Sequence, residues 1–223
     1  MADVALVCGA GGALGSALVE TLLERGDRVV GVDHLALDAP APAGLRRETA
    51  DLTSADDLVA LWDRLAADGE TPRFVVNAAG GFRTGSVADS EPDEVRFLEQ
   101  LNLGTAWWSC REAARRLEPG GAIVNVSART GLSGGAGSAA YAVAKAGVIR
   151  LTEVLAAELA PRRVRVNAIL PALIDTPANR ATMSAEALEN AVSPAALASV
   201  VSFLLSDAAS AVTGAVVPVY GFA

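Results

Sequence analysis

The 223-residue sequence is poor in the residue types that mark disulfide-bonded, metal-binding and nucleic-acid-binding proteins. It has two cysteines and one histidine, so we expect neither a disulfide framework nor a metal site. The formal net charge at pH 7 is −8, whereas binding to nucleic acid requires clustered Lys and Arg that neutralise phosphates. Nucleic acid is therefore not an expected partner.

Long apolar runs are also missing from the sequence. No stretch approaches the roughly 18 uninterrupted apolar residues that predict a membrane-spanning helix. The N-terminal residues lack the basic segment followed by an apolar one that marks a secretory signal. We therefore expect no membrane association and a cytoplasmic location. Aromatic residues make up only 4% of the chain and hydrophobic residues 52%, with many Ala and Val residues that suit helices packed closely on a sheet.

Short β-branched runs alternate with longer helical patterns along the whole chain. Continuous apolar runs are typical of strands buried on both faces of a parallel sheet. The alternation predicts an α/β protein with one Rossmann-type domain over residues 1–223, a doubly wound parallel sheet with helices on both faces. The expected strands cover residues 4–8, 28–33, 74–77, 122–127, 164–169 and 215–219, and the expected helices cover residues 14–25, 54–67, 93–117, 139–159 and 195–205.

A glycine-rich segment, residues 9–15, follows the first expected strand and begins the first expected helix. Glycines there let the backbone approach a pyrophosphate, whose charge the helix N-terminus stabilises. The alternative is a tight strand-to-helix turn without a ligand. Asp33 favours a turn that binds a dinucleotide, because a carboxylate at the end of the second strand can accept hydrogen bonds from the adenosine ribose. The same carboxylate would repel a 2′-phosphate. The sequence therefore predicts NAD(H) rather than NADP(H), with His34 as a loop residue beside the adenosine.

Tyr141 and Lys145 are four residues apart, so a helix places both side chains on one face. A nearby ammonium lowers the pKa of a tyrosine by favouring the phenolate. Such a tyrosine can give or take a proton while hydride moves to or from a nicotinamide. The same spacing also occurs by chance on helix surfaces, so the pair gains its meaning from the other motifs.

These residues are part of a longer ordered set. It contains Gly9-x-x-x-Ala13-x-Gly15, Asp51, Asn77-Ala-Ala-Gly80, Asn102, Asn125-Val-Ser127, Tyr141-x-x-x-Lys145, Asn167, residues 171–176 and residues 206–214. In order and spacing the set resembles the short-chain dehydrogenase/reductase family. The resemblance implies an NAD(H)-dependent oxidoreductase that moves hydride to or from a small carbonyl, hydroxyl, imine or quinonoid substrate. It also implies a homo-oligomer, a tetramer or a dimer.

The resemblance further implies a role for each matching residue. Tyr141 would be the acid/base, Lys145 would hold the nicotinamide ribose and tune Tyr141, and Asn102 would anchor a water in a proton relay. The implied cofactor-binding residues are Gly9, Gly11, Gly12, Ala13, Leu14, Gly15, Asp33, Asp51, Leu52, Asn77, Ala78, Ala79, Gly80, Tyr141, Lys145, Pro171, Ile174 and Thr176.

Two residues depart from the family pattern. Ala13 replaces a usual glycine, which is tolerable if its φ is negative. The larger departure is Ala128, which stands 13 residues before Tyr141, where the family has its catalytic serine. Loss of such a hydrogen-bond donor to a developing oxyanion typically costs about 3 to 4 kcal/mol.

Three explanations for Ala128 stay open. Ser138, included among the candidate catalytic residues, or Ser133 could supply a hydroxyl, whereas Ser127 should point to the other face of its strand. Alternatively, the substrate needs no such donor, as in dihydropteridine reductase-like members, which also have Ala there. Finally, the protein could be a catalytically silent NAD-binding sensor or assembly subunit.

The segment that follows residues 171–176 decides the substrate in this family. Here it is short, residues 177–191, with one expected helical stretch over residues 185–191 before Pro194 begins the next helix. Arg83 or Arg180 could pair with an acidic substrate group, although a solvated surface position is the favoured interpretation of both. The candidate linings of the substrate side are Phe82, Arg83, Asn179, Arg180 and Met183.

Overall fold

The computed structural model describes residues 2–36 and 40–222. These residues form a seven-stranded sheet in the order β3-β2-β1-β4-β5-β6-β7, in which every pair is parallel. The predicted doubly wound, Rossmann-type sheet is confirmed. The strands are β1 (Val4–Cys8), β2 (Arg28–Asp33), β3 (Leu45–Thr49), β4 (Phe74–Asn77), β5 (Ala122–Val126), β6 (Arg165–Pro171) and β7 (Val216–Val219).

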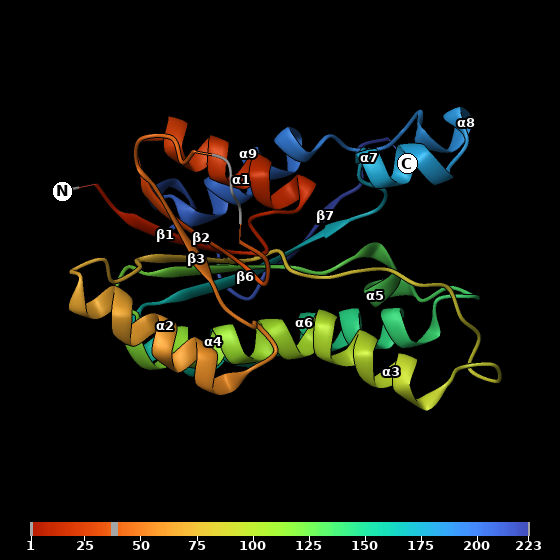
Figure 1. Cartoon of the computed structure of the whole chain (residues 1–223), viewed down its shortest axis with the longest axis horizontal. Helices are drawn as coiled ribbons and strands as arrows, with labels where there is room; N and C mark the ends of the chain where they lie inside the picture. Colours follow the sequence, from red (N-terminus) through yellow and green to blue (C-terminus); the bar gives the residue numbers. More distant parts are fainter. Residues whose placement is uncertain (1, 37–39, 223) are drawn as a thin grey trace.

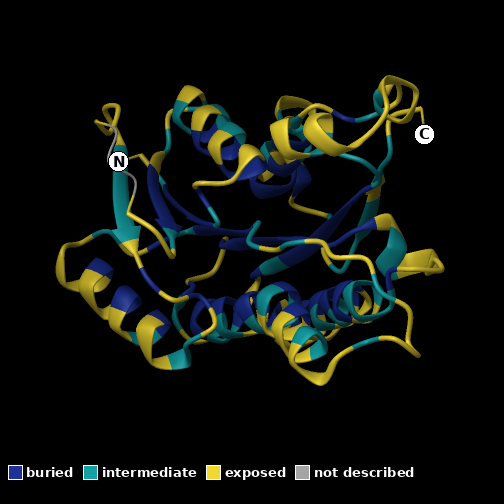
Figure 2. Cartoon of the chain, turned by 45° about the vertical axis from the view of Figure 1, so that its right-hand side comes forward, coloured by how far each residue is buried: buried dark blue, intermediate teal, exposed yellow. Residues whose placement is uncertain are grey.

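Helices cover both faces of the sheet (Figure 1). One face carries α1 (Ala13–Glu24) and α9 (Pro194–Leu205), and the other carries α2 (Ala55–Ala67), α4 (Thr105–Arg116) and α6 (Ala139–Leu159). Their apolar sides and the strands form two large buried clusters, one on each face, besides a small third one. Figure 2 shows this burial in the sheet and on the inward sides of the helices. Ser54 caps α2, because its side chain accepts a hydrogen bond from the Asp57 amide.

The strand order reverses between β1 and β4. From β1 the chain moves outward through β2 and β3, and it then returns to build β4, β5, β6 and β7 on the other side. The last residues of β1 and β4, Cys8 and Asn77, are direct neighbours in the sheet. In open α/β sheets ligands bind beyond the carboxyl ends of the strands at such a reversal. The expected glycine-rich segment therefore lies at the position where the fold binds ligands.

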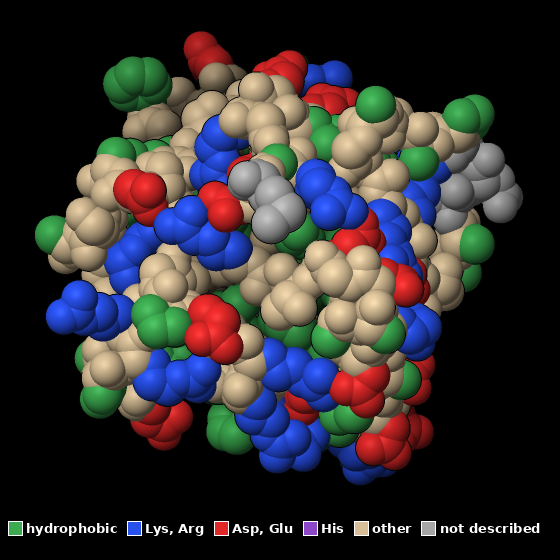
Figure 3. All heavy atoms as spheres, turned by 90° about the vertical axis from the view of Figure 1, so that its left-hand side faces the viewer, with side chains coloured by type: hydrophobic (Ala, Val, Ile, Leu, Met, Phe, Trp, Pro, Cys, Tyr) green, Lys and Arg blue, Asp and Glu red, His purple; other side chains and the backbone are tan. Residues whose placement is uncertain are grey.

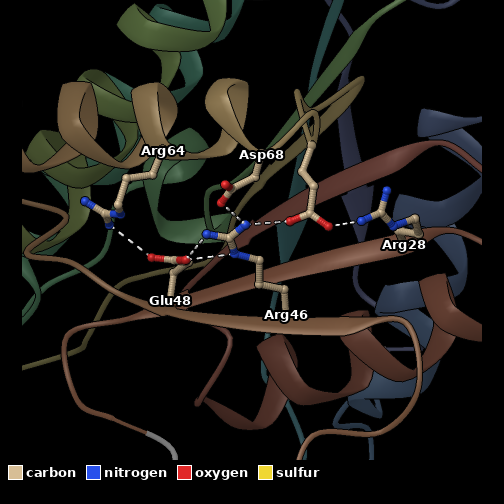
Figure 4. Close-up of polar contacts among 6 residues, drawn as sticks. Arg28, Arg46, Glu48, Arg64 and Asp68 are labelled. Atoms are coloured by element: carbon tan, nitrogen blue, oxygen red, sulfur yellow. Dashed lines mark hydrogen bonds and ion pairs between the residues drawn. The ribbon is translucent and has the colours of Figure 1, made fainter.

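The edge strand β3 is an element that the sequence pattern did not predict. Its sequence, Leu-Arg-Arg-Glu-Thr, is charged because an edge strand has a neighbour on one side only and carries polar side chains there. Arg46 is the centre of an ion-pair network, with its guanidinium 2.6 Å from carboxylate oxygens of both Glu48 and Asp68 (Figure 4). Two further ion pairs extend the network, Arg64 with Glu48 and Arg28 with Glu70, and Arg46 also contacts Glu70. Acidic and basic side chains are likewise interleaved on the face shown in Figure 3.

The long helix expected over residues 93–117 is confirmed within one residue at each end, since residues 92–116 are helical without a break. Its middle was not expected: α3 (Pro92–Glu99) continues into a π-helical segment (Gln100–Gly104) before α4. Such π segments occur inside α-helices and are frequent at functional sites. One helical expectation was wrong in extent. The lid expected to be helical over residues 185–191 instead has two short helices, α7 (Pro177–Thr182) and α8 (Ala185–Leu188). A short helix, α5 (Arg129–Ser133), was also not expected.

Within residues 2–36 and 40–222, no helix is long and apolar enough to cross a membrane. The same residues hold no cluster of three or more His, Cys, Asp or Glu side chains that could bind a metal ion. Both cysteines are free and buried, and burial raises the pKa of Cys8 to about 11 and that of Cys110 to about 12.

Candidate functional site

The glycine-rich segment forms a tight turn that packs against the end of β4. Gly9 has a φ of +87°, and a Cβ atom there would lie 2.7 Å from the Ala79 amide nitrogen. A Cβ atom on Gly15 would lie 2.0 Å from the Gly9 carbonyl oxygen. Among the described residues only Arg163 is a non-glycine with positive φ, so Ala13 has the negative φ that its methyl group requires. The turn is therefore a backbone cradle that side chains would fill.

Asp33 lies beside this turn, as the sequence predicted. Its Oδ2 atom accepts a hydrogen bond from the Gly11 amide at 2.9 Å, and its Oδ1 atom accepts one from the His34 amide at 2.8 Å. Burial opposes ionisation, but these bonds and the contact with the His34 ring together lower the pKa of Asp33. The carboxylate is thus ionised at the carboxyl end of β2, next to the amides of the glycine turn.

Asp51 and Leu52 follow β3 on the same side of the molecule. The Asp51 carboxylate accepts hydrogen bonds from the Thr53 hydroxyl and amide, which lower the pKa of Asp51. The neighbouring His34 also lowers the pKa of Asp51. Leu52 is buried.

The segment Asn77–Gly80 joins the glycine turn to the Tyr–Lys pair. Asn77 donates through Nδ2 to Asn125 Oδ1 at 2.8 Å, while its own Oδ1 is buried and finds no hydrogen-bond partner among the described residues. Gly80 is the meeting point, because a Cβ atom there would lie 2.7 Å from Asn102 Oδ1 and 3.1 Å from Lys145 Nζ. The motifs that are far apart in the sequence therefore converge at one place.

Asn102 is buried in the π-helical segment, and its side chain holds the loop after β4. Its Nδ2 atom donates to the Gly81 carbonyl at 2.9 Å and to the Leu98 carbonyl at 3.0 Å, and its Oδ1 atom accepts from the Gly81 amide at 3.1 Å. The two-way bond to Gly81 fixes the backbone next to Lys145. A water-anchoring role for Asn102 stays a prediction.

Tyr141 and Lys145 lie on one face of α6, as their spacing predicted. The Lys145 Nζ atom is 5.8 Å from the centroid of the Tyr141 ring and donates to the Val126 carbonyl at 3.0 Å. Burial raises the pKa of Tyr141 to about 12 and lowers the pKa of Lys145 to about 8. The expected lowering of the tyrosine pKa by the ammonium was therefore wrong for the chain by itself, because desolvation of the buried phenolate is the dominant influence.

Ala128 is buried at the N-terminus of α5, and the three nearby serines have other partners. Ser127 donates to the Lys145 carbonyl at 2.7 Å, so its hydroxyl is engaged with the backbone of α6. Ser138 donates to the Gly135 carbonyl at 3.2 Å, and Ser133 donates to the Arg129 carbonyl at 3.2 Å. A direct donor role for Ser138 or Ser133 stays a prediction and would require the hydroxyl to leave this bond.

Three residues near Ala128 were missed by sequence reasoning. The Thr130 Oγ1 atom is buried and finds no hydrogen-bond partner among the described residues. The guanidinium of Arg129 lies over the ring of Tyr220, with Cζ 5.6 Å from the centroid. Only proximity to Ala128 could have drawn attention to Arg129 and Thr130, and nothing in the sequence connects them to Tyr220.

Most of the residues expected to line the substrate side contact other residues of the chain. Phe82 contacts the Tyr141 ring edge to face, at 5.0 Å between centroids. Arg180 forms a two-pronged ion pair with Asp175, with N–O distances of 2.5 and 2.6 Å. Asn179 Nδ2 donates to the Ile174 carbonyl, and the Thr176 side chain caps α7. Arg83 stacks on Phe97 at 4.5 Å and lies 4.0 Å from Glu94. Met183 is exposed.

Two motif asparagines are structural. Asn125 joins β4, β5 and α6, because it accepts from Asn77 and donates to Thr152 Oγ1 at 2.9 Å. Asn167 joins β6 to the loop before β7 through bonds to the Val212 carbonyl and the Ala215 amide. Pro171 is the last residue of β6, so the Pro171–Thr176 segment leaves the sheet at its carboxyl edge.

A dinucleotide fits the residues present at this edge. The glycine turn leaves a cradle free of side chains, Asp33 offers carboxylate oxygens beside it, and Asn77 leaves a buried oxygen unpaired. The helix α1 begins at the turn, with the partial positive charge that favours a phosphate. Fold and site together define a Rossmann-type α/β protein with a tyrosine–lysine pair next to a dinucleotide cradle.

The comparisons with known proteins agree with this class. The family model described as enoyl-(acyl carrier protein) reductase matches residues 9–221. A cis-4-hydroxycyclohexanecarboxylate dehydrogenase of Sinomonas cyclohexanicum is 36% identical over 98% of this chain and 95% of its own length. An oxidoreductase of the short-chain dehydrogenase/reductase family from Burkholderia thailandensis is 32% identical with a TM-score of 0.86, over 99% of this chain and 92% of that one. The chain belongs to the short-chain dehydrogenase/reductase family of oxidoreductases.

A further solved structure carries a bound cofactor. The 4-hydroxyisoleucine dehydrogenase complexed with NADH is 26% identical to this chain, with a TM-score of 0.86 over 98% of this chain and 97% of that one. A structural neighbour of the same fold therefore binds a nicotinamide dinucleotide.

Proposed function

We propose that the protein is an NAD(H)-dependent oxidoreductase that interconverts a small secondary alcohol and the corresponding carbonyl compound, with Tyr141 as acid/base. The convergence of Gly80, Asn102 and Lys145 beside Tyr141 carries the proposal. Bound NAD(H) would accept or supply the hydride. The two relatives named above that act on hydroxylated acids, 4-hydroxycyclohexanecarboxylate and 4-hydroxyisoleucine, support an alcohol substrate.

The residues of the chain would position the reactants and move the proton. The turn at residues 9–15 and the N-terminus of α1 would hold the pyrophosphate, and Asp33 would hold the adenosine ribose. Lys145, fixed by the Val126 carbonyl, would bind the nicotinamide ribose hydroxyls. Because the pKa of Tyr141 is raised to about 12, its phenol is protonated at neutral pH and can donate a proton to a forming alkoxide.

The NAD preference rests on Asp33, whose ionised carboxylate would repel a 2′-phosphate. We expect NADH to bind at least about tenfold more tightly than NADPH, a difference of about 1.4 kcal/mol. Titration of both cofactors against tryptophan fluorescence measures the ratio. The variant Asp33→Asn should reduce it, whereas Asp56→Asn, at an exposed acid on α2, should not. Tighter binding of NADPH by the unaltered protein would refute the role given to Asp33.

Ala128 leaves the reacting oxygen without the family's serine hydroxyl. We expect Ala128→Ser to raise kcat/KM for reduction of a simple ketone by about tenfold or more, because one oxyanion donor is worth about 3 to 4 kcal/mol. The matched control is Ala66→Ser, at an exposed position on α2. Initial rates with NADH and cyclohexanone measure the effect. An unchanged or lower rate in Ala128→Ser would show that position 128 does not face the reacting oxygen.

Two alternatives remain in the proposal. A substrate that needs no serine, such as a quinonoid dihydropterin, would explain Ala128 equally. A catalytically silent NAD-binding sensor or assembly subunit would retain the cradle without turnover. A screen of secondary alcohols, ketones, imines and quinonoid dihydropterins separates them, since turnover of any of these excludes the silent protein.

Exposed apolar side chains on α4 and α6, among them Trp107, Val143 and Val154, support assembly into homo-oligomers.

A further inference from the structure

Arg129 lies directly next to the position where the family's serine is missing. It is the first residue of α5, and its side chain is exposed. The helix α5 is pressed against α6, because a Cβ atom on Gly131 would lie 2.7 Å from the Lys145 carbonyl carbon. Arg129 therefore belongs to a short helix that is fixed against the backbone of the proposed catalytic pair.

The contact with Tyr220 holds the Arg129 guanidinium in place. Tyr220 directly follows β7, and it packs on the buried cluster of Ile149, Ala168 and Leu170. Its ring is thus anchored at the carboxyl edge of the sheet, where the β5 and β7 ends also lie. A guanidinium over a ring is attracted to the ring face and keeps its N–H donors free for a carboxylate.

Arg129 also differs in charge environment from the other arginines of the substrate side. Arg180 is neutralised by Asp175, and Arg83 lies near Glu94. In the part of the chain that the structure describes, the Arg129 guanidinium has no carboxylate within ion-pair distance. It contacts the face of the Tyr220 ring instead. A guanidinium is charged at every physiological pH, so this site presents an uncompensated positive charge. An anionic group is the ligand that this charge favours.

We propose that Arg129 binds a carboxylate of the substrate, so that the protein acts on hydroxy acids and oxo acids in preference to neutral alcohols and ketones. The proposal rests on the proposed function, in which Tyr141 exchanges a proton with the reacting oxygen. A two-pronged guanidinium–carboxylate contact fixes both the position and the orientation of the substrate. This contact would hold the reacting carbon in place where Ala128 offers no hydroxyl. The acidic group expected to meet Arg83 or Arg180 is thereby assigned to Arg129.

The test compares an acid with its uncharged analogue of nearly the same shape. The ligands are cis-4-hydroxycyclohexanecarboxylate and its primary carboxamide, and the proteins are the unaltered chain, Arg129→Gln, Arg129→Lys and the remote control Arg64→Gln. Binding is measured by calorimetry on the NADH-loaded protein, in which the alcohol has no hydride acceptor, and turnover with NAD⁺ is measured separately from NADH absorbance. We expect the unaltered protein and Arg64→Gln to bind the acid at least about tenfold more tightly than the carboxamide.

In Arg129→Gln this preference should disappear, through weaker binding of the acid and unchanged binding of the carboxamide. Arg129→Lys should retain part of it, because lysine keeps the charge without the planar fork. A preference for the acid that survives in Arg129→Gln, or no binding of the acid to the unaltered protein, overturns the proposal. Arg129-dependent binding of the acid without turnover of any substrate would instead refute the proposed oxidoreductase function and leave the carboxylate site in place.

Discussion

Replacement of Tyr141 by phenylalanine is expected to lower kcat by about two or more orders of magnitude while NADH binding stays intact. The substitution removes only the phenol oxygen. The ring keeps its edge-to-face contact with Phe82 and its position on α6, so the local packing should not change. In the proposed function the lost group exchanges a proton with the substrate oxygen, so its loss should lower the rate of the chemical step and not the binding of the cofactor.

The measurement combines turnover of the best substrate from the screen with a fluorescence titration of NADH. Thermal unfolding of Tyr141→Phe provides the structural control, because an unaltered midpoint excludes a folding defect. A further readout is the pH profile. The pKa of Tyr141 is about 12 in the free chain, so alcohol oxidation, which needs the phenolate, should accelerate with rising pH in the unaltered protein and not in the variant. Wild-type-like turnover in Tyr141→Phe would contradict the acid/base role.

The elements that the sequence predicted correctly are those whose structure depends on neighbouring residues in the chain. Buried strands such as β1 and β4 are continuous apolar runs, and the helix α6 begins and ends where its pattern predicted. The strand-to-helix turn at residues 9–15 and the charge at Asp33 are consecutive features of one βαβ unit, so their spacing in sequence fixes their proximity in space.

The unpredictable part depends on contacts between distant segments. β3 is charged because its side chains pair with Arg64 of α2 and with Asp68 and Glu70 of the segment that follows α2. No local rule distinguishes such an edge strand from a polar loop. The Arg129–Tyr220 contact joins two residues that are far apart in the sequence, one after β5 and the other after β7. The raised pKa of Tyr141 arises from burial, which the four-residue spacing to Lys145 does not reveal. The four-residue spacing places Tyr141 and Lys145 on one face of α6, and their burial shifts their pKa values.

Replacement of Gly15 by alanine is expected to disrupt both the fold of the cofactor cradle and the binding of NADH. A Cβ atom at this position would lie 2.0 Å from the Gly9 carbonyl oxygen and 2.8 Å from the Ala10 Cα atom. Both are backbone atoms, so the strain cannot be relieved by rotating a side chain. The turn would have to open and draw Gly11 away from its hydrogen bond with Asp33.

We expect Gly15→Ala to lower the free energy of unfolding by about 1 to 3 kcal/mol, as overpacked sites typically do. NADH affinity should fall by about tenfold or more, because the amides proposed to hold the pyrophosphate would lose their arrangement. The matched stability control is Gly12→Ala, whose Cβ atom would lie at an ordinary 3.5 Å from the Gly9 carbonyl oxygen and whose φ of −74° suits alanine.

Urea denaturation and an NADH titration of both variants measure these changes, and Gly12→Ala should unfold within about 0.5 kcal/mol of the unaltered protein. Equal stability of Gly15→Ala and Gly12→Ala would contradict the close backbone approach. Full NADH affinity in a destabilised Gly15→Ala would separate the two roles of the turn, because it would show that the helix N-terminus alone holds the phosphates. The expected joint loss instead identifies the packing of Gly15 on Gly9 as the feature that shapes the cradle.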